Sequence, residues 1–192
     1  MYSLIIDSAT KILYVGLVKD DKVLSEVYVE GQHDHAKNIV AKVDEILKNN
    51  NIEAFDLDEI ITGIGPGSYT GVRMAVSVAK MLAVFGHKPL YSISTLKLMA
   101  SGIKGNVLTL IDARRGNSFS CILDTNKDEY VVKEGMYNTE EMLAKSYDAV
   151  VKEDNYKVDA LYVLKAKVAV PEPHLLVPNY LRETEAERNI HD

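Results

Sequence analysis

Residues 63–80 read GIGPGSYTGVRMAVSVAK, a glycine-rich turn followed by a long apolar run. The apolar residues 59–64 before the turn predict a buried strand, and the run after it predicts a helix that continues to about Phe85. Backbone amides at a helix start can hold a phosphate, but glycines can also serve only to let the chain turn sharply. The nature of this turn therefore distinguishes two kinds of α/β protein. One binds a nucleotide at the turn, and the other has a helix whose apolar surface must be buried by another part of the chain or by a partner.

The turn lacks the residues of three motifs that carry chemistry. A dinucleotide-binding loop needs a third glycine where Ser68 stands, and a P-loop needs Lys and Ser or Thr after its last glycine, where Val and Arg follow Gly71. A nucleophile elbow needs glycines at the positions of Pro66 and Thr70. We therefore favour a structural turn, stiffened by Pro66, in which Ser68 or Thr70 caps the helix.

A residual contact with a nucleotide or phosphate is the alternative. Asp7 and Thr10 follow the first predicted strand, and Gly65, Gly67 and Ser68 can offer backbone amides at the helix start. A lone Asp in a tight turn is more often a cap. The residues alone leave this alternative open.

The helix after the turn is apolar over roughly 220° of its circumference at about 100° per residue, about twice what one sheet face covers. One arc holds Val72, Ala75, Val76, Ala79, Leu82 and Ala83, and an adjoining arc holds Met74, Val78, Met81 and Phe85. A patch of that width indicates an interface. The candidate partner surface is the second arc together with Ile39 and Val43 of the preceding helix. Alternatively, the second half of the same chain covers the helix.

The composition predicts a folded protein of a reducing compartment. The 192 residues are 47% hydrophobic, with a single cysteine, Cys121, and a net charge of −6. That charge repels a polyanion, so contact with RNA needs a local patch or a partner. The N-terminus lacks a basic head and no run of eighteen apolar residues exists, so we expect neither a signal peptide nor a membrane span. Cytoplasmic localisation is the expectation.

The order of predicted elements suggests two similar α/β halves. Strands are expected at 3–6, 12–18, 23–29, 59–64, near 90, 107–111, 118–123 and within 161–170, and helices before 49, to about 85, from about 94 and at 140–149. A meander, a helix, a strand and a helix are thus followed by a weaker repeat. The predicted domains are residues 1–103 and a shorter second half, residues 104–192.

Five segments, in order along the chain, resemble the TsaB (YeaZ) family of tRNA threonylcarbamoyladenosine proteins. They are IIDSAT at 5–10, HDHAKNIV at 33–40, GPGSYTGVR at 65–73, IDARRGNSF at 111–119 and PNYLRETEAE at 178–187. The third segment is the most specific. Between about 125 and 177 the match is thin, which indicates a reduced second half.

The resemblance implies an actin-like, sugar-kinase-like fold and a subunit that is not itself the catalyst. In this family a paralogue, TsaD, holds the metal and transfers the threonylcarbamoyl group to adenosine beside the anticodon. The resemblance further implies a heterodimer with TsaD through the two helices of the first half, a homodimer when alone, and a separate ATPase, TsaE, in the larger complex. It implies tRNA contact only through the complex, no cofactor, no metal and no membrane.

Other candidate residues have weaker patterns. Asp112 has the place in the second half that Asp7 has in the first, at the end of the first strand. Arg114 and Arg115 come soon after Asp112, where an ATP-binding protein would have a glycine-rich phosphate turn. These arginines form a solvated turn or touch a partner or tRNA phosphates in an assembly. His33 and His35 could begin a metal site, yet the other histidines have no ligand spacing. Cys121 is expected in the core, and Tyr180 with Arg182 is expected to tie the tail to the body.

Three other functions are alternatives to the subunit role. An actin-like ATPase or kinase-like enzyme would use Asp7 and the turn 65–71. A plain homodimer would use the apolar helix for a second copy. Peptide hydrolysis of the glycoprotease type is disfavoured, because no Ser-His, Cys-His or His-Glu set can be assembled from the spacing.

Overall fold

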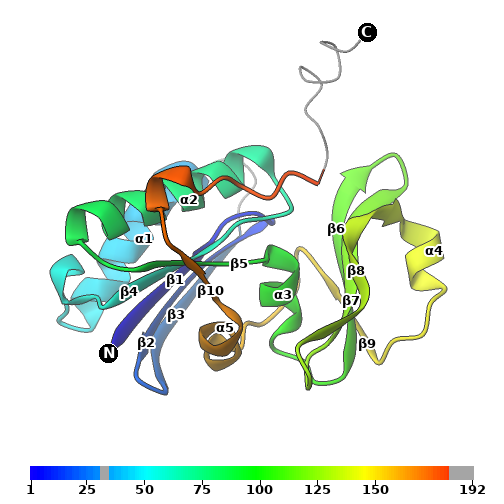
Figure 1. Ribbon diagram of the computed structural model, residues 1–192, viewed down its shortest axis with the longest axis horizontal. Coiled ribbons are helices and arrows are strands. Elements are labelled where there is room, and N and C mark those ends of the chain that lie inside the picture. The colour runs from blue at the N-terminus through cyan, green and yellow to red at the C-terminus, as the bar shows by residue number, and fades with distance from the viewer. Residues whose placement is uncertain (31–34, 182–192) are drawn as a thin grey trace, which may run out of the picture.

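A computed structural model describes residues 1–30 and 35–181, with the side chains of 35–37 excepted. It contains two β-sheets with helices on their faces (Figure 1). The first sheet has the strand order β10-β5-β4-β1-β2-β3, and the second has the order β8-β7-β6-β9. Within the described ranges, no helix is long and apolar enough to cross a membrane.

The first sheet begins as an antiparallel meander and continues with parallel strands. Its strands are β1 (Tyr2–Asp7), β2 (Ile12–Lys19), β3 (Lys22–Glu30), β4 (Glu59–Gly63), β5 (Leu90–Ile93) and β10 (Val168–Val170). The parallel pairs β1–β4 and β4–β5 each need a crossover, which α1 and α2 supply. The bounds of these helices are α1 (His35–Asn49) and α2 (Tyr69–Gly86). Both cover the same face of the sheet (Figure 1).

The second sheet repeats the meander with fewer helical residues. It consists of β6 (Asn106–Arg114), β7 (Asn117–Asp124), β8 (Glu129–Asn138) and β9 (Ala149–Lys152). The helix α4 (Thr139–Leu143) covers its far face (Figure 1), where Leu108, Leu110, Ile122 and Met142 form a buried cluster. The fold is therefore mixed α/β with two related halves, of which the second is the shorter in helix.

A shared core joins the halves. The helices α3 (Thr95–Ala100) and α5 (Ala160–Ala166) lie between the two sheets (Figure 1). This core contains Ile5 and Tyr14 from the first sheet and Val107 and Cys121 from the second, all fully buried. After α5 the chain returns to the first sheet, where β10 pairs antiparallel with β5. The returning segment is part of the predicted second half in sequence but pairs with the sheet of the first half. The domain boundary between residues 103 and 104 stays a prediction.

The structure corrects one prediction in the second half and narrows another. The helix expected at 140–149 ends at Leu143, because the backbone of Asp148 pairs with Asn106 and draws the chain into β9. Residues 161–166 are helical, because the carboxylate of Asp159 caps the amides of Leu161 and Tyr162. The strand predicted in this region is confined to Val168–Val170. The strands β8 and β9 were not predicted.

Candidate partner-binding face and the cleft between the halves

The glycine-rich turn packs directly against the turn between β1 and β2. The Ser68 amide donates to the carbonyl of Ala9 at 2.7 Å, and the Ser8 hydroxyl donates to the carbonyl of Gly71 at 2.7 Å. A Cβ atom at Gly67 would lie 2.2 Å from the Ala9 oxygen, and one at Gly71 would lie 2.0 Å from the Ser8 oxygen. These glycines are thus explained by close backbone approach, without a ligand.

The start of α2 has the cap that the sequence predicted. The Ser68 hydroxyl accepts from the Gly71 amide at 3.3 Å. Before it, Gly65 has a φ of +89°, a conformation that favours glycine, and its amide donates to the Thr95 hydroxyl at 3.1 Å. The turn is therefore held by α3 on one side and by the β1–β2 turn on the other.

The predicted nucleotide residues Asp7 and Thr10 lie inside the protein. Asp7 is fully buried and accepts hydrogen bonds from the Thr95 hydroxyl at 2.6 Å and from the Ala9 amide at 2.8 Å. Burial raises the pKa of Asp7 to about 6 although both hydrogen bonds lower it. The Thr10 hydroxyl shares a hydrogen bond of 2.9 Å with the Tyr156 hydroxyl of the second half. The structure thus gives both residues internal partners, and a nucleotide contact by them stays a prediction.

The outer face of α2 carries exposed apolar side chains. Met81 is 44% exposed and Phe85 is 75% exposed, whereas Met74 is half-buried against the core beneath the helix. On the neighbouring helix α1, Val40 is 51% exposed. The alanine arc of α2 packs inward as expected, with Ala75, Ala79 and Ala83 buried. Exposed apolar side chains therefore remain on both helices; we call Val40, Met81 and Phe85 together the outer strip.

Three of the residues predicted to lie in the partner interface are buried inside this chain instead. Ile39, Val43 and Val78 are buried in the core between the first sheet and its two helices. They stabilise the pair α1–α2 from below and do not reach the outer surface. Sequence periodicity identified the apolar face of each helix but could not divide it between the sheet, the neighbouring helix and the solvent.

The C-terminal segment covers one flank of α2 but not the outer strip. The 3-10 helix Pro173–Leu175 lies beside α2 (Figure 1), and Leu176 packs on Val72 and Val76. Tyr180 stacks on Tyr69 with ring centroids 5.2 Å apart, as the predicted tie of the tail requires. Arg182, named for the same tie, lies outside the described residues. As far as residue 181, the second half covers α2 on this flank, which agrees in part with the alternative that the second half covers the helix.

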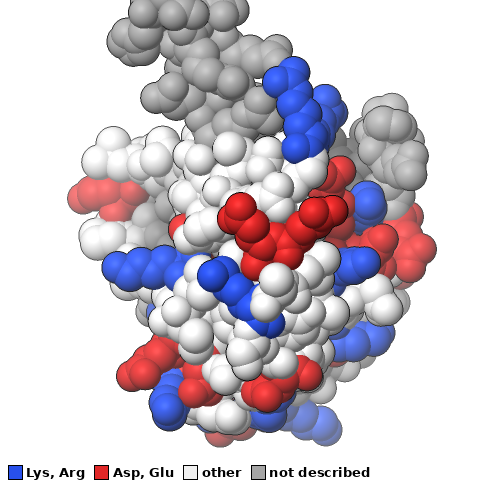
Figure 2. Space-filling view, turned by 90° about the vertical axis from the view of Figure 1, so that its right-hand side faces the viewer, with Lys and Arg blue, Asp and Glu red and all other residues white. Residues whose placement is uncertain are grey.

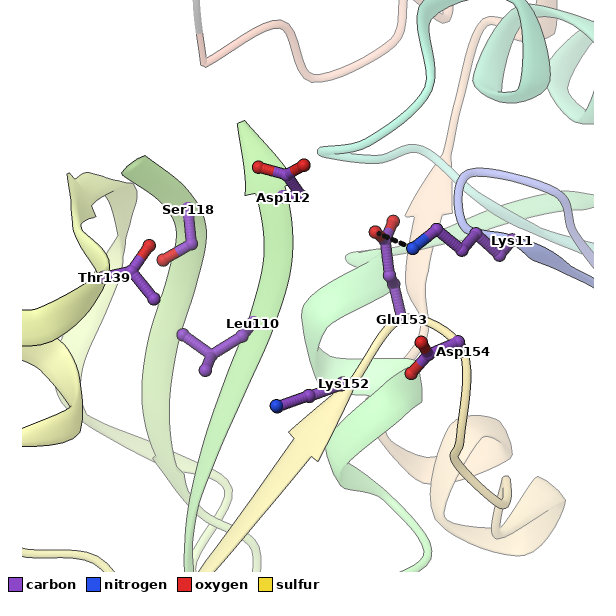
Figure 3. Close-up of a pocket in the computed structure, with 8 residues that line it drawn as sticks. All are labelled: Lys11, Leu110, Asp112, Ser118, Thr139, Lys152, Glu153 and Asp154. Carbon is purple, nitrogen blue, oxygen red and sulfur yellow. Dashed lines mark ion pairs between the residues drawn. The ribbon is translucent and has the colours of Figure 1, made fainter. Parts of the chain in front are cut away.

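A cleft of about 270 Å³ opens between the halves (Figure 3). Lys11 reaches it from the β1–β2 turn and forms an ion pair of 3.1 Å with Glu153, which follows β9. The hydrogen bond and charge of Glu153 raise the pKa of Lys11. Asp112 and Asp154 also line the cleft. Glu153 neutralises Lys11, which leaves the carboxylates of Asp112 and Asp154 and the single lysine Lys152. This excess of negative charge disfavours the binding of a phosphate in the cleft.

The turn between β6 and β7 has an unusual backbone. Arg114 and Arg115 have φ values of 66° and 55°, and Gly116 follows with 74°. Left-handed backbone costs about 1–2 kcal/mol for each residue with a Cβ atom. The Asp112 carboxylate supports the turn by accepting from the Arg114 amide at 2.8 Å. Both arginines are exposed.

The remaining candidates do not form a reactive site in the described part of the chain. Cys121 is buried, and this burial raises the pKa of its thiol to about 12, which disfavours the thiolate. His33 and the side chain of His35 lie outside the described residues. Among the side chains that are described, no three His, Cys, Asp or Glu residues come together as metal ligands.

Comparison with known proteins assigns the chain to a family. The family model described as "TsaD: tRNA N6-adenosine threonylcarbamoyltransferase" matches residues 22–176. The "tRNA threonylcarbamoyladenosine biosynthesis protein TsaB" of Bacillus subtilis (strain 168) is 32% identical over 123 residues, 62% of this chain, and its Escherichia coli (strain K12) counterpart is 34% identical over 124 residues, also 62% of this chain. The chain belongs to the TsaD family, as a TsaB (YeaZ) member.

The TsaB relatives are matched over only part of their length. The matched segments are 54% and 53% of the two curated proteins, so the chain spans about half the length of the relatives it matches. The fold is matched more fully: a structure titled "YeaZ from Pseudomonas aeruginosa" superimposes with a TM-score of 0.77 at 21% identity, covering 94% of this chain and 99% of that one. Together with the two related α/β halves, this confirms the actin-like, sugar-kinase-like fold class.

Proposed function

We propose that this chain is a non-catalytic subunit that binds a TsaD-type transferase and supports threonylcarbamoyladenosine modification of tRNA. TsaB family membership connects the chain to this biosynthesis. The observation that carries the partner role is the outer strip of α1 and α2. Phe85 and Met81 remain 75% and 44% exposed on a helix that buries Val72, Val76, Val78 and three alanines.

The outer strip suits a protein partner. Burying a Met or Phe side chain yields about 1.5–3 kcal/mol, so covering Met81 and Phe85 would contribute substantially to association. Methionine adapts to irregular surfaces, which fits a site that takes more than one partner. Arg73 and Ser77 are exposed on the same helix and can form a polar rim.

The role proposed for the chain is structural support of its partner. The glycine turn is occupied by the β1–β2 turn, and Asp7 is hydrogen-bonded within the core. A TsaD-type paralogue would supply the chemistry, and a TsaE-type ATPase would join the larger assembly. The isolated chain would form a homodimer through the same outer strip, and tRNA would be reached through the complex.

The test is co-purification with the TsaD-type protein of the same genome, followed by calorimetry. We expect Met81→Asp and Phe85→Asp each to weaken the heterodimer by at least about 30-fold, because an unpaired carboxylate in an interface costs about 2 kcal/mol or more. Thermal unfolding should be unchanged, since both side chains are exposed in the isolated chain.

The matched control is Val131→Asp. Val131 is 58% exposed on β8, in the second sheet, so it tests an exposed apolar residue far from α2. Wild-type affinity in this variant, with loss in the two α2 variants, would support the assignment. Association that survives both α2 substitutions would contradict it, and ATP binding by the isolated chain tighter than about 10 µM would favour a nucleotide enzyme.

A further inference from the structure

We propose that the β6–β7 turn contacts the sugar-phosphate backbone of the RNA on which the assembly acts, through Arg114 and Arg115. This inference rests on the proposed function. The two guanidinium groups are adjacent in sequence and exposed at a hairpin tip. Within residues 1–30 and 35–181, neither group has an ion-pair partner or a side-chain hydrogen bond.

The residue types in this turn are not explained by the hairpin itself. Arg114 pairs with Asn117, so Arg115 and Gly116 are the two central residues of the loop, both with positive φ. Such a turn favours Asn-Gly or Asp-Gly, because Asn and Asp tolerate left-handed backbone better than Arg does. Arg114 adds a second left-handed residue with a Cβ atom, at a register irregularity. Backbone strain held at an exposed tip points to a use for the side chains.

Phosphate is the ligand that two free guanidinium groups fit. Their planar donors bind phosphate oxygens in pairs, and such contacts position a nucleic acid without reading its sequence. The chain carries a net charge of −6, and the face of the second sheet mixes acidic and basic side chains without a broad basic area (Figure 2). A local contact of this kind is therefore what the chain can offer to RNA.

The position of the turn agrees with a contact made within an assembly. The β6–β7 turn lies at the upper edge of the second sheet, on the same side of the molecule as α2 (Figure 1). A partner seated on the outer strip and an RNA at the turn could thus be held together. The β2–β3 hairpin, with Lys22, lies on the opposite side.

The experiment uses the complex with the TsaD-type protein and an unmodified tRNA transcript, with affinity measured from 50 to 200 mM salt. For Arg115→Asn alone and together with Arg114→Asn, we expect the slope of log affinity against log salt to decrease by about one for each arginine removed. The melting temperature should stay the same or rise by about 2–4 °C, since Asn fits the turn better. Weaker RNA binding by a hairpin of equal or greater stability would support a phosphate contact.

Lys22→Asn is the control for loss of one exposed charge at a hairpin, and it should leave the slope unchanged. An unchanged slope in the double arginine variant would overturn the inference while the proposed function stands. Loss of partner affinity at an unchanged slope would also overturn it, in favour of a contact with carboxylates of the partner. Failure of the wild-type chain to assemble, which is seen before RNA is added, would overturn both proposals.

Discussion

Replacing Asp7 with Asn is expected to remove a pH-dependent contribution to the stability of the protein. Asp7 is fully buried, and a Cβ atom at Gly63 would lie only 1.6 Å from its Oδ2 atom, so no space for water exists on that side. Burial raises the pKa of Asp7 from its ordinary value of 3.8 to about 6. At about 1.4 kcal/mol for each step on the pH scale, this rise corresponds to up to about 3 kcal/mol.

The sign of the effect follows from proton uptake. Between pH 6 and pH 4, folded Asp7 keeps a proton that the unfolded chain has released, so folding becomes more favourable as the pH falls. Above pH 6 both states are ionised, and the folded state carries the full cost of a buried carboxylate. The contribution is thus present below the unfolded pKa and is lost as the pH rises through the folded pKa. Asn cannot ionise and has no such dependence.

The assay is urea unfolding of both proteins at several pH values from 4 to 7.5. The stability of the wild type minus that of Asp7→Asn should rise by about 2–3 kcal/mol as the pH falls through this range, and other carboxylates cancel in the difference. The Thr95 hydroxyl donates to Asp7 and lowers its pKa, so Thr95→Val should move the transition to higher pH. A difference that stays constant within about 0.5 kcal/mol would refute the reasoning.

Three further substitutions test the contacts that position α2, β10 and α3. Gly71→Ala should destabilise the fold by about 2 kcal/mol in urea unfolding, because its Cβ atom would lie 2.0 Å from the carbonyl oxygen of Ser8; wild-type stability would show that the two turns can separate without cost. Lys167→Met should cost about 3 kcal/mol by the same assay, because it leaves the carboxylate of Glu59, 4% exposed, without its cation; Glu59→Gln in the same chain should recover part of this loss. Ser94→Ala should lower thermal stability by about 1 kcal/mol, because the Ser94 hydroxyl accepts from the first amides of α3, and an unchanged melting temperature would mean that solvent replaces the cap.

Much of the first half could be predicted from the sequence. In α1 and α2 the apolar residues recur at helical spacing because each helix has one face on the core, whereas β1 and β2 are nearly continuous apolar runs because both of their faces are buried. The cap of α2 by Ser68 follows the prediction, and a phosphate contact by the glycine turn stays a prediction. Local chemistry was sufficient for these elements.

The second half depends on contacts between distant residues. The edge strand β8 alternates exposed and half-buried residues without a strong apolar pattern. The end of α4 is set by the Asp148 carboxylate and backbone, which bond to Asn106 in β6. No pattern within 139–150 contains that information. Tertiary pairing overrode helix propensity here.

The sequence could predict which helix carries the candidate partner-binding surface, but not which of its side chains are exposed. The sequence identified α2 as too apolar for one sheet, and Met81 and Phe85 are indeed exposed. It could not show that Val78 is buried in the core of the first half, because that depends on how the helices pack on the sheet and on each other. The left-handed backbone of Arg114 and Arg115 had no signal either, since Arg-Arg-Gly is not a common hairpin loop.

The return of β10 to the first sheet has a consequence for synthesis of the chain. Strand β5 is complete by Ile93, but its neighbour β10 is made only when the ribosome reaches Val170. During that interval the backbone groups of β5 on that edge are unpaired, and Glu59 has no lysine beside it. Nascent chains stalled before residue 168 should therefore be the form most prone to edge-to-edge aggregation and most dependent on chaperones.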